Sequence, residues 1–73
     1  MTRSEFFKTV QTRNIDPESF ALDGVENEAY VLQKREARWV VFYSERGLES
    51  GIRDFAMESD ALDHLLSRLR PGF

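Results

Sequence analysis

The sequence predicts an α+β domain: an N-terminal helix, a short extended segment, a three- to four-stranded antiparallel meander, and a C-terminal helix packed on one sheet face. Two observations carry this prediction. Apolar residues recur at helical spacing near both ends of the chain, and three β-rich segments between them are joined by connections too short for parallel crossovers. The 73 residues are expected to form one domain, residues 1–73, of modest stability, because a domain this small buries only about 60% of its unfolded surface.

The first helix is predicted over residues 3–12. Thr2 and Glu5 have the spacing of a capping box, in which each satisfies a backbone N–H of the other. The apolar stripe of this helix consists of Phe6, Phe7 and Val10. Because this stripe is short, we expect the helix to pack beside the second helix or over a sheet edge.

The segment 15–24, IDPESFALDG, has two interpretations. Asp16 followed by Pro17 is a helix-start signal that would give one turn. Alternatively, Phe20 and Leu22 are the inward positions of a short strand that a turn at Asp23-Gly24 closes. We favour a helical turn that runs into a short edge strand.

Three further strands are predicted over residues 28–35, 38–45 and 51–57, from their β-branched and aromatic residues. Polar residues around position 36 reverse the chain after the first of these strands. Gly47 and Gly51 bracket the second connection, and Gly47 is expected to supply a positive φ.

The strand WVVFYSE at 39–45 is apolar on both faces. Trp39, Val41 and Tyr43 share one face, and Val40 and Phe42 share the other, because side chains alternate along a strand. One set must meet the helices. The other set needs a second cover, either the first helix or a partner, and an uncovered aromatic patch would mark a binding surface.

Ser59 is the predicted N-cap of the last helix, with Asp60 in its first turn, where a carboxylate complements the helix dipole. Pro71-Gly72 is expected to stop this helix. His64 lies off the apolar stripe and is expected to face solvent. The apolar face comprises Ala61, Leu62, Leu65, Leu66 and Leu69.

Composition argues against catalysis. The chain has no cysteine, and His64 is its single histidine, so thiolate chemistry, a catalytic triad and the usual zinc sites are not expected. The four glycines are scattered at turns and form no phosphate-binding loop. We therefore predict a protein that is not an enzyme and takes no cofactor or metal.

The charge distribution suggests a partner class. Between residues 14 and 33 five acids occur and no base: Asp16, Glu18, Asp23, Glu26 and Glu28. This segment disfavours nucleic acid and would suit a basic partner, but composition alone favours the simpler interpretation of a solvated acidic loop. The chain shows no apolar leader and no apolar run long enough for a membrane span, so we expect a cytoplasmic protein without membrane contact.

The pattern W-x-V-F-Y-x-E-R-G, followed by F-x-x-E-x-x-A before a leucine-rich helix, resembles small immunity proteins of bacterial polymorphic-toxin systems. The residues that carry the resemblance are Trp39, Val41, Phe42, Tyr43, Glu45, Arg46, Gly47, Phe55, Glu58 and Ala61. The resemblance implies an antitoxin that neutralises a cognate toxin domain by stoichiometric occlusion.

A basic active-site surface on the toxin would complement the acidic segment, and aromatic and arginine side chains are typical interface anchors. The alternative is a homodimeric or adaptor interaction module. The candidate partner-binding residues are Asp16, Glu18, Asp23, Glu26, Glu28, Tyr30, Trp39, Tyr43, Glu45 and Arg46.

Overall fold

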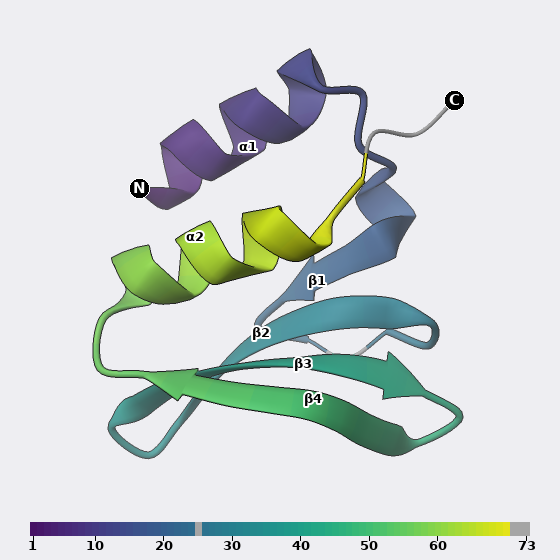
Figure 1. The fold of residues 1–73 in the computed structure, drawn as a ribbon, viewed down its shortest axis with the longest axis vertical. Helices are drawn as coiled ribbons and strands as arrows, with labels where there is room; N and C mark the ends of the chain where they lie inside the picture. The colour runs from purple at the N-terminus through teal and green to yellow at the C-terminus, as the bar shows by residue number, and fades with distance from the viewer. Residues whose placement is uncertain (25, 71–73) are drawn as a thin grey trace.

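Two helices lie on one side of a four-stranded sheet in the computed structural model, which describes residues 1–24 and 26–70 (Figure 1). The α2 helix lies against the sheet, and α1 packs on α2. This arrangement confirms the α+β fold. The elements in chain order are α1 (Arg3–Thr12), the 3-10 turn η1 (Pro17–Ser19), β1 (Phe20–Leu22), β2 (Ala29–Arg35), β3 (Arg38–Glu45), β4 (Leu48–Phe55) and α2 (Glu58–Arg68).

The sheet has the order β1-β2-β3-β4. The strands β2, β3 and β4 form the predicted antiparallel meander. The short strand β1 differs, because it pairs with β2 in parallel, with Phe20 opposite Tyr30. A parallel pair requires the chain to return to the other end of the sheet between its strands. The sheet is therefore mixed, and its first connection runs along the sheet.

The capping box of α1 is present as predicted. The Thr2 hydroxyl accepts from the Glu5 N–H at 3.2 Å, and the Glu5 carboxylate accepts from the Thr2 N–H at 2.8 Å. The 15–24 segment also follows the favoured interpretation. Asp16 caps η1 by accepting from the Glu18 N–H at 2.9 Å, and the chain then enters β1.

The boundaries of β4 correct the predicted 51–57 strand. The chain reverses in two residues, Arg46 and Gly47, whose φ angles of 52° and 78° match the positive φ that tight hairpin turns favour. The strand therefore begins at Leu48 rather than at Gly51. Gly51, with φ 62°, lies instead at a β-bulge, where the register against β3 shifts between Val41 and Tyr43.

Two predictions about α2 are wrong. Its N-cap is Met57, without a side-chain hydrogen bond, and Ser59 instead accepts a hydrogen bond from the Met1 nitrogen at 2.6 Å. His64 does not face solvent: its ring lies 5.3 Å from the Phe55 ring and is half-buried. The predicted stop at Pro71-Gly72 lies outside the described residues.

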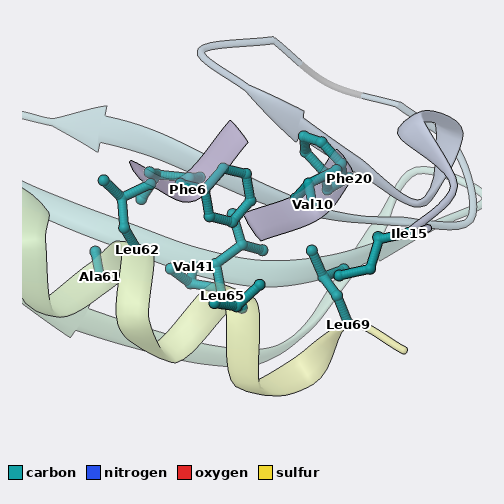
Figure 2. Packing of buried hydrophobic residues seen from close by; sticks show 11 residues of the cluster. Phe6, Val10, Ile15, Phe20, Val41, Ala61, Leu62, Leu65 and Leu69 are labelled. Atoms are coloured by element: carbon teal, nitrogen blue, oxygen red, sulfur yellow. The ribbon is translucent and has the colours of Figure 1, made fainter. Parts of the chain in front are cut away.

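The main core fills the space between the sheet and the helices. Figure 2 shows side chains of α1, β1, β3 and α2 converging there, and the predicted α2 face is buried in full. Phe6 and Phe20 meet edge to face, with ring centres 5.2 Å apart. The buried members are Phe6, Val10, Ile15, Phe20, Leu32, Val41, Ala61, Leu62, Leu65, Leu66 and Leu69.

A second, smaller cluster occupies the opposite sheet face, so the apolar side chains of β3 are buried on both faces of the sheet. Trp39 and Val41 face the helices, whereas Val40 and Phe42 belong to the second cluster together with Val31. Phe42 is only 1% exposed, although no helix covers it. Gln33 donates to the Gly24 carbonyl oxygen at 3.1 Å, so the connection after β1 passes over this face. On the sheet face away from the helices, the described part of β3 therefore has no exposed aromatic patch of the kind considered from the sequence.

Candidate functional site

A hollow of about 810 Å³ lies along the outer side of β1. It is bounded by η1 on one side and by the connection toward β2 on the other. Four of the five predicted acids, Asp16, Glu18, Glu26 and Glu28, line it, and none of the described residues in its lining is basic. Within residues 1–24 and 26–70, none of these four carboxylates forms an ion pair. The hollow therefore carries concentrated negative charge.

An apolar groove of about 400 Å³ adjoins this hollow and shares Pro17 and Phe20 with it. Its wall on the α1 side includes Phe7, which is 45% exposed and lies 6.3 Å from Phe20 between ring centres. Exposed aromatic surface beside a charged rim is typical of protein interaction sites. The hollow and the groove together form what we call the β1 surface, lined by residues 7, 10, 11, 14–22, 24 and 26–28.

The candidate residues Tyr30, Tyr43 and Glu45 lie next to the acidic end of the β1 surface. Tyr30 and Tyr43 are opposite each other in the sheet, with ring centres 5.0 Å apart. Partial desolvation raises the pKa of the Tyr43 phenol, and the nearby carboxylates of Glu45 and Glu28 raise this pKa further. Glu28 therefore lies close enough to Tyr43, near the C-terminal end of β3, to act on it electrostatically.

Asn27 fastens the β1 surface to the turn between β3 and β4. Its side-chain oxygen accepts from the backbone N–H of Arg46 at 2.6 Å. Arg46 itself is exposed and has φ 52°. The positive φ predicted for Gly47 is confirmed, at 78°, and the hydrogen bond from Arg46 to Asn27 holds the acidic connection against this turn.

Two of the ten predicted residues lie elsewhere. Asp23 binds Arg3 through both carboxylate oxygens, at 2.6 and 2.9 Å, and this ion pair lowers the pKa of Asp23. Arg3 also binds Glu58 at 2.8 Å, so Asp23 helps to join β1 to both helices. Trp39 packs against the main core at the other end of β3, with the Lys34 nitrogen 5.5 Å from its ring centre.

The sequence reasoning missed the apolar half of the β1 surface. Phe7 and Pro17 were assigned to helix packing and helix initiation. A signal was available, because Phe6 and Phe7 are adjacent and a helix cannot bury both on one narrow stripe. Asn27 carried no signal of its own, since its partner lies 19 residues away.

Within the described residues, no cluster of three or more His, Asp or Glu side chains has the arrangement of a metal site. No helix of the described chain has the length and apolar character needed to span a membrane. No family model, curated protein or solved structure matches the chain.

Proposed function

We propose that this protein is an immunity protein that neutralises a cognate bacterial toxin by binding it stoichiometrically and covering its active site. The observation that carries the proposal is the β1 surface. Its carboxylates have no cationic partner within the described chain, and an apolar groove borders them. A toxin that acts on an anionic substrate presents the basic surface that this arrangement complements.

The sequence pattern supports the same proposal. Trp39, Val41 and Phe42 build the two cores, and Gly47 forms the tight turn after β3. These residues of the W-x-V-F-Y-x-E-R-G pattern thus act in the scaffold. This scaffold presents the β1 surface.

The proposal predicts a toxin gene beside this one, and the experiment is co-expression with the toxin domain that such a gene encodes. We expect growth of cells that produce both proteins, and arrest of cells that produce the toxin alone. A charge-reversed variant, Glu18→Lys with Glu26→Lys, should protect less well, whereas Glu36→Lys with Asp60→Lys changes the charge equally elsewhere and should protect fully. Arrest in the presence of the folded wild-type protein would refute the immunity role.

A further inference from the structure

Among residues 1–24 and 26–70, β1 is an edge strand with β2 as its single strand partner, and the hollow lies beside it. All three β1 residues line the hollow, although their side chains alternate between the two sheet faces. Because neighbouring side chains lie on opposite faces of a strand, a space lined by all three residues is expected to reach the strand edge between the two faces. The hollow therefore gives access to the backbone of β1.

The pairing pattern identifies the backbone groups on that side. The Asp23 N–H donates to the Leu32 carbonyl oxygen at 2.9 Å, in register with the parallel pairing of Leu22 and Leu32. In a parallel pair, alternate residues direct both backbone groups toward the neighbouring strand. Ala21 and Asp23 thus face β2, and the N–H groups of Phe20 and Leu22 point outward.

The opposite edge of the sheet is guarded, which sets β1 apart. The edge strand β4 carries the charged residues Glu49, Arg53 and Asp54 and a bulge at Gly51, all of which oppose the addition of another strand. The described lining of the hollow beside β1 contains four acids and no basic side chain, so the hollow attracts cations. The negative charge beside β1 is therefore complementary to an incoming strand with positive side chains.

The apolar groove adds a second requirement. It lies beside Phe20 on the helix side of β1, between Phe7 and Ile15. A strand placed along β1 would direct alternate side chains toward this groove. One apolar side chain among basic ones would enter it without burying a charge.

The geometry points to a basic, extended protein segment with one apolar anchor, which joins the sheet as a fifth strand beside β1. Backbone hydrogen bonds to Phe20 and Leu22 hold the segment, and the carboxylates of Glu18, Glu26 and Glu28 bind its cationic side chains. This mode of recognition combines main-chain affinity with side-chain pockets. The inference rests on the proposed function only in taking this segment to belong to the toxin.

The test uses a capped synthetic peptide, acetyl-Lys-Thr-Lys-Val-Leu-Thr-Arg-Thr-Lys-amide, added to the full chain at low salt. We expect saturable shifts of the backbone amide signals of residues 20–22 in NMR spectra. Exchange of the Phe20 and Leu22 amide protons should slow at least roughly tenfold, because these protons enter hydrogen bonds with the peptide.

Two control peptides separate strand addition from charge attraction. A version with N-methyl groups on the three central amides keeps every side chain and charge but cannot pair along a strand edge. It should bind at least roughly tenfold more weakly, which corresponds to about 1.4 kcal/mol. A version with glutamate in place of each lysine and arginine should not bind.

Protein variants test the two halves of the surface. Glu18→Lys with Glu26→Lys should weaken binding of the basic peptide at least roughly tenfold at low salt, unlike the matched pair Glu36→Lys with Asp60→Lys. Phe7→Ser should weaken binding of the same peptide and leave the fold intact, since Phe7 is 45% exposed.

Failure of the peptide to bind at about 1 mM, or equal binding of the methylated peptide, would overturn the inference. If the protein protects cells from the toxin in either case, the immunity role stands and only strand addition fails. If the peptide binds as expected and no protection occurs, the site stands and the immunity role fails.

Discussion

The Arg35 guanidinium lies over the Phe42 ring, with its central carbon 4.8 Å from the ring centre. Arg35 also binds both carboxylate oxygens of Glu49 on β4, and its Nε donates to the Gln33 side-chain oxygen at 3.2 Å. Phe42 is thereby buried on the sheet face away from the helices. A planar guanidinium suits this position because it stacks on an aromatic face while its edge donates to a carboxylate.

Replacement of Arg35 should therefore destabilise the protein through lost cover rather than lost charge. We expect Arg35→Ala to lower the free energy of unfolding by about 1–2 kcal/mol, because it exposes Phe42 and removes the cation–π contact. Urea denaturation followed by Trp39 fluorescence measures the change.

The matched control is Arg38→Ala. Arg38 lies on the same face and binds Asp54 at 3.2 Å, but its side chain is 50% exposed. An exposed pair of this kind contributes at most about 1 kcal/mol. Equal losses in the two variants would contradict the covering role of Arg35.

Contacts such as that of Arg35 with Phe42 show which features of the fold cannot be predicted from the sequence. The capping box of α1 and the leucine face of α2 depend on residues within one turn of each other, so the sequence alone predicts them. The cover of Phe42 depends on Arg35, which lies over the Phe42 ring only when the sheet has formed. The parallel direction of β1 is likewise set by the connection between β1 and β2. This connection is short, and short connections favour an antiparallel arrangement.

The candidate site likewise has features that the sequence predicts and features that follow only from packing. The run of acids around Glu18 and Glu26 was visible as composition, and four of those acids do line one hollow. Asp23 belongs to the same run, yet its pairing with Arg3 follows from the packing of α1 against the end of β1. The apolar groove combines Phe7 with Phe20, two residues that belong to different elements.

Leu65 gives the clearest test of the main core. Its side chain is fully buried between α2 and the sheet. We expect Leu65→Ala to lower the free energy of unfolding by about 2–5 kcal/mol, since it removes buried methyl groups and leaves a cavity. In urea denaturation Leu48→Ala is the control, because Leu48 is 73% exposed. A negligible effect at Leu65 would mean that α2 packs on another face.

The single histidine should make stability depend on pH near neutrality. Burial lowers the pKa of His64, and the positive charges of Arg68 and Arg53 lower this pKa further. The unfolded chain, with a histidine pKa of about 6.5, therefore binds the proton more readily than the folded protein does. The free energy of unfolding should decrease as the pH falls from about 7 through 6.5, and level off below the pKa of the folded state.

His64→Gln should remove this dependence between about pH 5 and 7. The lowered pKa values of Asp23 and Glu49 act only in more acidic solution, because their stabilising effect is lost as the pH falls through their folded-state values. Thermal denaturation of both proteins across this range measures the difference. An unchanged slope in the variant would assign the effect to other groups.

The acidic surface should control the rate at which a basic partner associates. Glu18→Lys with Glu26→Lys should slow association with the toxin about tenfold or more at low salt, and the difference should shrink as salt rises. Asp16 is left in place because it caps η1. Stopped-flow mixing measures the rate, and unaltered rates at low salt would exclude this surface from the encounter.

The oligomeric state of the protein, a monomer or the homodimer considered from the sequence, depends on whether the edge strand β4 pairs with a second copy. Leu48 and Ile52 are exposed on it, which favours self-association, whereas the charges of Arg53 and Asp54 and the bulge at Gly51 oppose edge pairing. We expect the charges and the bulge to dominate, so the wild-type protein should be a monomer. Sedimentation equilibrium at about 200 μM, a concentration at which weak dimers would be populated, should therefore give the monomer mass.

The double variant Arg53→Ala with Asp54→Ala removes two charges that oppose edge pairing and should produce concentration-dependent association. Lys8→Ala with Asp60→Ala makes the same change in charge on the helices and should leave a monomer. A wild-type dimer would instead assign the β4 edge to a second copy of the chain.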